Sequence, residues 1–258
     1  MNSTVQPQPI LQDKVALITG TGGGQGRAAA LRFAAAGARV VGCDLKSAGN
    51  RETLALVHAA GGVMVGMEPV DLADPAQASR WIEEAAALHG RIDILYNNAS
   101  SARFAPFESF PVEDWQYTVR NELDLVFYVT RCAWRWLQKR GGVVINTASV
   151  AGIAGSGPGG AAHAATKGAV IALTKQLAME GAPHGIRVVA ISPGFIDTPA
   201  TAPLVADAQA RDLLLARSLI KRVGQPEDIA GVALFLASED AAFMTGANVV
   251  VDGGRVAW

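Results

Sequence analysis

Three side chains that could take part in proton transfer lie within one short segment, residues 149–167. Ser149 follows a β-rich run, and His163 and Lys167 stand four positions apart in a stretch with helical character. Residues four apart share one face of a helix, so we expect the imidazole and the ammonium group side by side. Because imidazole titrates near neutral pH, it can act there as a general acid or a general base. The segment therefore predicts a proton-transfer site built from a hydroxyl, an imidazole and a cation.

The elements that would position this site alternate between strand and helix along the chain. β-rich runs lie at residues 14–19, 39–44, 63–70, 92–96, 143–147, 186–192 and 247–251. Helical stretches follow the glycines after the first run and occupy residues 50–60, 75–88, 112–140, 160–180 and 226–237. This alternation predicts one α/β domain, a doubly wound parallel sheet of about seven strands with helices on both faces. Ser149 lies at the end of a strand, where such sheets carry ligands and catalytic groups.

Composition limits the class of protein. Half of the 258 residues are apolar, 17% are charged, and the net charge at pH 7 is −1. This balance gives no reason to expect binding to nucleic acid or to a membrane surface. Cys43 and Cys132 match no metal-ligand spacing, so we expect buried free thiols in a soluble protein of the reducing cytoplasm. Residues 1–12 lack the basic start and apolar core of a secretion signal, and we expect a flexible extension there, followed by a single domain over residues 13–258.

Glycines crowd the first strand–helix turn, at Gly20, Gly22, Gly24 and Gly26. Closely spaced glycines before a helix let backbone N–H groups approach a pyrophosphate at the helix N-terminus. Asp44 ends the second expected strand, 18 residues beyond the last of these glycines, where a carboxylate can accept hydrogen bonds from an adenosine ribose. The pattern predicts a dinucleotide site in a Rossmann-type domain; the alternative is a tight turn followed by a solvated aspartate.

The same turn resembles the TGxxxGxG signature of the short-chain dehydrogenase/reductase family, with Thr19-Gly20 and Gly24-x-Gly26 in the matching places. Further matches follow in the family's order along almost the whole chain. They are Asp71-Leu72, Asn97-Asn98-Ala99 with Ser100 in place of the family's glycine, residues 146–152, Pro193-Gly194 with Thr198, residues 224–227 and residues 251–254. The resemblance implies an NAD(P)-dependent oxidoreductase acting on CH–OH groups, with an insert at about residues 195–223 that lines the substrate.

The resemblance also implies which residues hold the cofactor. They are Gly20, Gly22, Gly24, Gln25, Gly26, Asp44, Asp71, Leu72, Asn98, Ala99, Lys167, Pro193, Gly194, Ile196 and Thr198. Asp44 favours NAD, because its carboxylate would repel the 2′-phosphate of NADP. Arg27 and Lys46 are the nearby cations that could bind that phosphate, and neither directly follows Asp44. NADP is therefore the less favoured cofactor.

The family's catalytic motif, as the resemblance implies it, is a Ser with a Tyr and a Lys in a YxxxK pattern, supported by an Asn on the preceding helix. Ser149 and Lys167 match, but His163 stands in the place of the tyrosine. Alignment of the preceding helix puts Glu122 in the place of the asparagine, whereas a one-residue bulge would restore Asn121 there. We expect Ser149, His163, Lys167 and Glu122 to be catalytic, with His163 as the general acid or base.

Two questions stay open at the level of sequence. The first concerns His163: the charge of Lys167 would favour a neutral imidazole and hence a general base, whereas a nearby Glu122 carboxylate would oppose this effect. Glu122 could also be only a helix residue held by a salt bridge. The chain could also be an NAD-binding protein that has lost its redox role and serves as a binding or regulatory subunit.

Substrate and assembly are predicted only in outline. Aromatic and aliphatic residues in the expected lining segments favour a small to medium, mainly apolar hydroxy or keto compound; they are Phe104, Phe107, Phe195 and Ile196. The long helical stretches at residues 112–140 and 160–180 are rich in apolar residues. In the family that the chain resembles such helices pair between subunits, so we expect a homotetramer or a homodimer.

Overall fold

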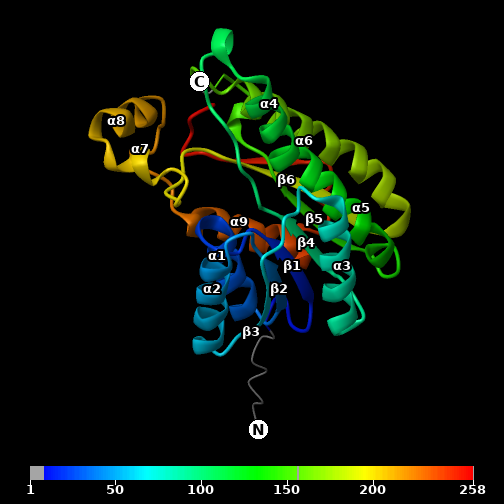
Figure 1. Ribbon diagram of the computed structural model, residues 1–258. Coiled ribbons are helices and arrows are strands. Elements are labelled where there is room, and N and C mark those ends of the chain that lie inside the picture. Colours follow the sequence, from blue (N-terminus) through cyan, green and yellow to red (C-terminus); the bar gives the residue numbers. More distant parts are fainter. Residues whose placement is uncertain (1–8, 156, 258) are drawn as a thin grey trace.

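A computed structural model describes residues 9–155 and 157–257, and within them one seven-stranded parallel sheet runs in the order β3-β2-β1-β4-β5-β6-β7 (Figure 1). The strands are β1 Val15–Thr19, β2 Arg39–Cys43, β3 Val63–Met67, β4 Ile94–Asn97, β5 Gly142–Thr147, β6 Ile186–Pro193 and β7 Asn248–Val251. The order reverses between β1 and β4, which makes the sheet doubly wound. The predicted Rossmann-type architecture is confirmed.

Nine α-helices lie in the described part of the chain. They are α1 Gly24–Ala35, α2 Ser47–Ala59, α3 Pro75–His89, α4 Val112–Val119, α5 Leu125–Leu137, α6 Ala161–Gly181, α7 Ala202–Ala206, α8 Ala208–Ala216 and α9 Pro226–Ala237. The helices α1, α2 and α9 cover one face of the sheet, and α3, α5 and α6 cover the other (Figure 1). The helices α7 and α8 lie within residues 195–223 and stand away from the sheet (Figure 1).

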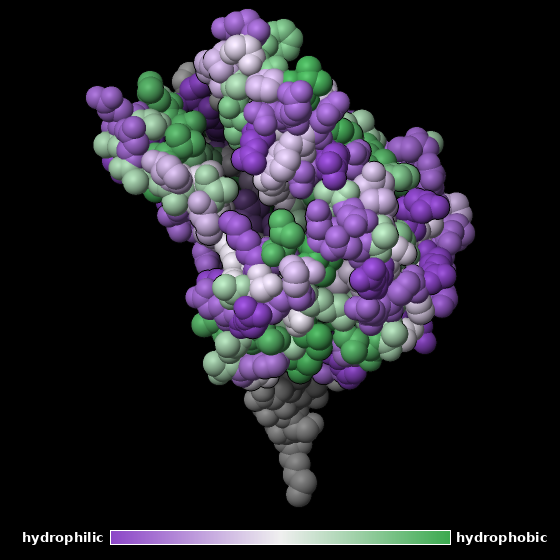
Figure 2. Space-filling view, in the orientation of Figure 1, coloured by the Kyte–Doolittle hydropathy of each residue, from purple (hydrophilic) through white to green (hydrophobic). Residues whose placement is uncertain are grey.

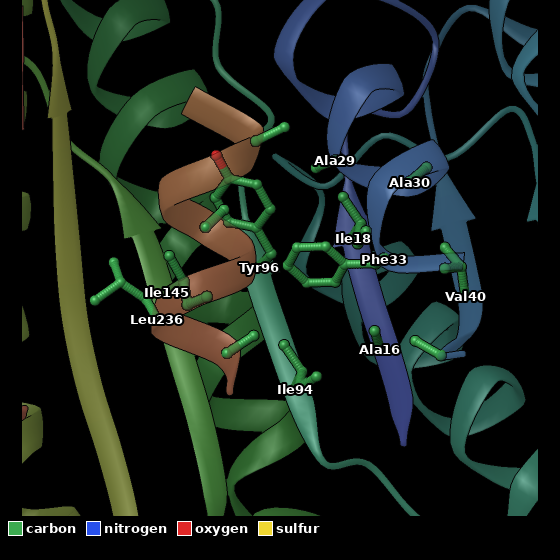
Figure 3. Packing of buried hydrophobic residues seen from close by; sticks show 14 of the residues in the cluster. Ala16, Ile18, Ala29, Ala30, Phe33, Val40, Ile94, Tyr96, Ile145 and Leu236 are labelled. Carbon is green, nitrogen blue, oxygen red and sulfur yellow. The ribbon is translucent and has the colours of Figure 1, made fainter. Parts of the chain in front are cut away.

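Each face of the sheet is sealed by its own apolar cluster. On the α1–α9 face, the rings of Phe33 and Tyr96 stack with centroids 6.4 Å apart, beside Leu236 of α9 (Figure 3). On the opposite face, Trp81 of α3 and Val129 of α5 are fully buried. Burial of each large apolar side chain contributes roughly 1.5–3 kcal/mol. These two clusters fix the sheet whose carboxyl edge carries the site.

Three boundaries differ from the prediction for local reasons. The strand β3 ends at Met67 rather than at residue 70, because Pro69 has no N–H with which to continue a ladder. The helical stretch 112–140 is broken by a π-helical turn, η2 Arg120–Asp124. Of the expected extension, residues 1–8 lie outside the described residues, and Leu11 is buried and donates its N–H to Ala36. The packed part of the chain therefore already includes Leu11.

No helix in the described ranges combines the length and the apolar composition that crossing a bilayer requires.

Candidate functional site

The ends of β1 and β4 are tied together at the carboxyl edge of the sheet. The Thr19 hydroxyl accepts the N–H groups of Asn98 and Ala99, both at 2.9 Å. The Asn98 side-chain amide donates to the Thr19 carbonyl at 3.0 Å. A Cβ on Gly20, whose φ is +74°, would lie 2.9 Å from Cα of Ala99. The strand order reverses at this pair of strands, so the predicted residues Gly20, Asn98 and Ala99 meet where a nucleotide would enter.

The glycine turn leads directly into α1 and leaves its first N–H groups available. A Cβ on Gly26 would lie 2.0 Å from the Gly20 carbonyl oxygen, so the helix can start this close to β1 only with glycine there. Within the described residues no side chain caps the helix at Gly23. The uncapped N-terminus carries a partial positive charge and free donors, which suits a pyrophosphate.

Asp44 lies over this turn. Its carboxylate accepts the N–H of Gly22 at 2.8 Å and the N–H of Lys46 at 2.7 Å. A Cβ on Gly22 would lie 2.7 Å from the same carboxylate, so glycine is what permits the contact. The negative charge predicted to select the cofactor is thus held in place beside the turn.

The Arg27 side chain is hydrogen-bonded to residues of α2. Its guanidinium donates to the Glu52 carboxylate at 2.6 Å and to the Thr53 hydroxyl at 3.0 Å, and it ties α1 to α2. One of the two cations considered for a 2′-phosphate is therefore already paired with an anion.

The other predicted cofactor residues divide into two groups. Thr198 lies beside the glycine turn, since a Cβ on Gly24 would come 3.2 Å from its side chain. Gln25 places a buried side-chain oxygen there that has no hydrogen-bond partner in the described part of the chain. The second group shows structural contacts: Asp71 accepts the Ala73 N–H, Leu72 and Ile196 are buried, Gly194 donates to Val251, and Pro193 ends β6.

Glu122 is the centre of the predicted catalytic group. It is 1% exposed, and both of its carboxylate oxygens lie 2.9 Å from Nδ1 of His163. The Ser100 hydroxyl donates to Oε1 at 2.7 Å, and the Thr166 hydroxyl donates to Oε2 at 2.6 Å. Nζ of Lys167 stands 3.7 Å from Oε1. One buried carboxylate thus connects a loop, the π-helical turn and α6.

The ionisation of Glu122 follows from these contacts. Burial on its own raises the pKa of a carboxyl group, because it penalises the charged form. The charge of Lys167 and the hydrogen bond from His163 outweigh that effect, with a further contribution from Thr166, and the pKa of Glu122 lies at about 2. The group is therefore an anion at any physiological pH.

Lys167 and Ser149 lie near a close backbone contact between the turn at Gly152 and the helix α6. Nζ of Lys167 donates to the Thr147 carbonyl at 3.0 Å, at the end of β5. Ser149 begins the short turn η3 Val150–Gly152, where its Oγ accepts the N–H of Ala151 at 3.1 Å. A Cβ on Gly152 would lie 2.6 Å from the Lys167 carbonyl carbon, so this turn packs on the backbone of α6.

The π-helical turn carries both Asn121 and Glu122, and the two side chains make different contacts. The bulge considered from the sequence is present, but Asn121 turns its amide back to the Tyr117 carbonyl at 2.8 Å. Glu122 is the residue that contacts His163. The structure thus brings Glu122, His163 and Lys167 together; the one side-chain contact described for Ser149 is the turn that it caps.

Two residues of the cluster were missed from the sequence. In the sequence, Ser100 stands out only as a departure from the family's glycine, and Thr166 is not singled out. The available signal for Thr166 was its spacing, three positions after His163 on one helix face.

An aromatic ring covers His163 on the loop side. Phe104 places its ring centroid 5.7 Å from that of His163, and Phe107 is 80% exposed nearby in sequence. Phe195 and Ile196 instead line a cavity of about 210 Å³ beneath the insert, with Ile220 and Val251. The molecular surface is hollowed between the α7–α8 segment and the body of the domain (Figure 2). The four predicted apolar residues therefore lie in two places.

Known proteins resemble the chain over nearly its whole length. A family model described as enoyl-(acyl carrier protein) reductase matches residues 20–255. The 3-oxoacyl-[acyl-carrier-protein] reductase FabG of Thermotoga maritima is 40% identical over 250 residues, covering 95% of this chain and 99% of that protein. Meso-2,3-butanediol dehydrogenase of Serratia marcescens is 35% identical over 245 residues, covering 95% of each.

The chain is also similar in fold and in sequence to solved structures. A putative 2-deoxy-D-gluconate 3-dehydrogenase from Agrobacterium tumefaciens, solved with bound NADP, has a TM-score of 0.90 and 37% identity, covering 98% of this chain and 100% of that one. A short-chain type dehydrogenase/reductase from Mycobacterium marinum has a TM-score of 0.91 and 32% identity, covering 96% and 98%.

Proposed function

The chain belongs to the short-chain dehydrogenase/reductase family and is an oxidoreductase of CH–OH and keto groups that uses a pyridine nucleotide, and we propose that His163 moves the proton. The contact of both Glu122 oxygens with Nδ1 of His163 supports this proposal. An ionised carboxylate only accepts hydrogen bonds, so Nδ1 carries a proton. Nε2 is then the atom left to exchange a proton with the substrate, as in other carboxylate–histidine pairs.

Each residue has a role in this scheme. In alcohol oxidation, Nε2 of His163 takes the hydroxyl proton, and the Glu122 anion stabilises the imidazolium that forms. The Ser149 hydroxyl donates to the substrate oxygen, and Lys167 supplies positive charge beside the cofactor ribose. When bound, the nicotinamide accepts a hydride from the carbinol carbon or supplies one to the carbonyl carbon. Because Glu122 compensates the charge of Lys167, the same histidine can serve in either direction.

NAD is the cofactor that we propose. The uncapped N-terminus of α1 and the glycine turn fit a pyrophosphate, and the fixed carboxylate of Asp44 fits ribose hydroxyl groups. A 2′-phosphate would meet that carboxylate, while Arg27 is held by Glu52. The Agrobacterium tumefaciens protein carries NADP, so the preference rests on Asp44 rather than on the relatives.

The proposed substrate is a small to medium, mainly apolar hydroxy or keto compound. The ring of Phe104 against His163 supports an apolar wall beside the reacting group. The names of the relatives cover several substrates, so the proposed substrate class is based on the residues that line the site.

A homotetramer or homodimer remains our proposal for assembly. Trp115 of α4, Phe127 of α5 and Met179 of α6 are 42%, 50% and 74% exposed, which leaves apolar surface on neighbouring helices. Burial of such surface favours association. Sedimentation velocity should show an assembly larger than a monomer at micromolar concentration, and a monomer there would refute the proposal.

The function is tested with a panel of apolar secondary alcohols and ketones and with NAD or NADH. Replacement of His163 by Ala should lower kcat by about 10²–10⁴-fold, the usual contribution of general acid–base catalysis, and leave NAD binding unchanged. Full activity of His163→Ala would refute its role. A wild type that binds NAD but turns over none of the panel would instead favour the binding or regulatory alternative.

A further inference from the structure

Two hydroxyl groups from different elements hold the Glu122 carboxylate. The Ser100 hydroxyl, on the loop after β4, donates to Oε1 at 2.7 Å. The Thr166 hydroxyl, on α6, donates to Oε2 at 2.6 Å. Each carboxylate oxygen therefore has its own hydroxyl donor, and the two oxygens share Nδ1 of His163 at equal distances of 2.9 Å. Charge-assisted hydrogen bonds of this kind are strong and directional.

Three departures from the family pattern coincide in this cluster. Ser100, Glu122 and His163 replace the glycine, asparagine and tyrosine that the resemblance implies. Ser100 and Glu122 are 22 residues apart in sequence, and Glu122 and His163 are 41 apart, yet each pair is hydrogen-bonded. Ser100 donates to Glu122, and Glu122 accepts from His163, so the three side chains form one hydrogen-bonded series. The contacts indicate that the three side chains work as one unit.

Lys167 competes for the oxygen that Ser100 holds. Its ammonium nitrogen lies 3.7 Å from Oε1, the same atom that accepts the Ser100 hydroxyl. Without that hydroxyl the carboxylate gains by rotating toward the ammonium group, which weakens its contact with His163. Ser100 therefore favours the orientation in which the anion faces the imidazole.

Ser100 is not placed to be a nucleophile. Its hydroxyl donates to the Glu122 carboxylate, whose pKa of about 2 makes it too weak a base to remove the hydroxyl proton. In the described ranges the charged groups that face His163 are Glu122, on the π-helical turn, and Lys167, on α6 itself, while Phe104 covers the ring from the loop. The imidazole and the ammonium group thus share one carboxylate.

We propose that Ser100 is a positioning residue for His163: its hydroxyl fixes the Glu122 carboxylate on Nδ1, so that Nε2 alone exchanges the proton. This rests on the proposed role of His163 in the oxidoreductase reaction. Thr166 holds the second oxygen from the helix that carries His163, whereas Ser100 holds the first from the loop that also carries Phe104. One loop thus carries both Phe104, which contacts the His163 ring, and Ser100, which orients the carboxylate that holds this ring.

The test compares Ser100→Ala with Ser100→Thr, which keeps the hydroxyl, and with Ser101→Ala. Ser101 is the matched control, because it is also an exposed serine but its hydroxyl contacts Tyr117 outside the cluster. The chain has four histidines, so ¹⁵N-histidine labelling, assigned with His163→Ala, gives a countable set of imidazole signals. The wild type and Ser101→Ala should show a downfield, exchange-protected Nδ1–H signal from His163. In Ser100→Ala that signal should move upfield and exchange faster, and Ser100→Thr should restore it.

Kinetics give the second readout. Ser100→Ala should lower kcat for alcohol oxidation by about tenfold with little change in KM, the size expected for one hydrogen bond to a charged group. The acid limb of its kcat/KM profile should move to lower pH, because a less well placed anion stabilises the imidazolium less. Equal signals and equal pH profiles in Ser100→Ala and Ser101→Ala would overturn the proposal, as would a wild type without a protected Nδ1–H. Absence of turnover with the signal intact would refute the oxidoreductase role alone.

Discussion

Both carboxylate oxygens of Glu122 lie 2.9 Å from Nδ1 of His163. Lys167 approaches the same carboxylate at 3.7 Å, so one buried anion serves two basic groups. With a neutral imidazole the cluster has no net charge, and with an imidazolium it has one positive charge. The geometry therefore places the Glu122 anion within reach of both the imidazole and the ammonium group.

Replacement of Glu122 by Gln should change how stability depends on pH. The pKa of Glu122 is lowered from 4.5 to about 2 in the folded chain, so its ionised form stabilises the fold above pH 4.5. That stabilisation, on the order of 3 kcal/mol, is lost as the pH falls from about 4.5 to 2. Urea unfolding of both proteins from pH 7 to pH 2.5 should show the wild type losing its advantage over Glu122→Gln at the acid end.

The matched control for this measurement is Glu52→Gln, an exposed carboxylate that pairs with Arg27. Its stability relative to the wild type should change little with pH, since exposed ion pairs contribute little. A constant difference between wild type and Glu122→Gln over the whole range would show that Glu122 is not held as an anion.

Replacement of His163 by Tyr should fail unless Glu122 is changed as well. A tyrosine at this position must approach the phenolate form to exchange a proton, and the buried Glu122 anion disfavours a second negative charge beside it. We expect the double variant Glu122→Asn with His163→Tyr to exceed His163→Tyr in kcat by about tenfold or more, and Glu122→Asn alone to be impaired. A double-mutant cycle on kcat/KM measures this coupling; additive effects would mean that the two positions act independently.

Asp44 should control the choice of cofactor. Replacement of Asp44 by Asn removes the charge that faces a 2′-phosphate, so the affinity for NADP relative to NAD should rise by about tenfold. Isothermal titration with both nucleotides measures the ratio, and Lys46→Ala serves as a neighbouring control that should keep the NAD preference. A wild type that binds NADP more tightly than NAD would contradict the assignment.

Phe104 should affect substrate binding more than the chemical step. Its ring lies 5.7 Å from that of His163, so Phe104→Ala removes an apolar wall beside the reacting group. We expect KM for apolar alcohols to rise by about tenfold, with kcat changing less. Phe243→Ala is the control, because that side chain is fully exposed and follows α9, on another part of the chain. Equal effects of the two substitutions would place the substrate elsewhere.

The fold was accessible from the sequence because its determinants are local. The run at residues 15–19, the glycine turn and the acid at Asp44 each define a strand or its end, and regular alternation is enough to predict a parallel sheet. The helix α9 has the predicted bounds because Pro226 begins it and a capping box formed by Gln225 and Asp228 closes its N-terminus.

The candidate catalytic cluster was accessible only in part. His163 and Lys167 share a helix, so their spacing in sequence is also their spacing in space. The resemblance placed Glu122 in the site, but the contact of Glu122 with His163 and that of Ser100 with Glu122 depend on tertiary packing, which no local pattern records. The π-helical turn was raised from the sequence only as an alternative, because its wider hydrogen-bonding pattern has no clear compositional signal.

That turn, Arg120–Asp124, has a genetic consequence. Each residue of a helix advances the chain by about 100° around the axis. Loss of a single codon within the turn would let α4 and α5 join as one regular helix and would swing the side chains on one side of the deletion away from their partners. The contacts of Glu122 in the proposed acid–base group would then be lost although Ser100, His163 and Lys167 are all present. Insertions and deletions in this one turn should therefore affect activity as strongly as substitutions of the clustered residues themselves.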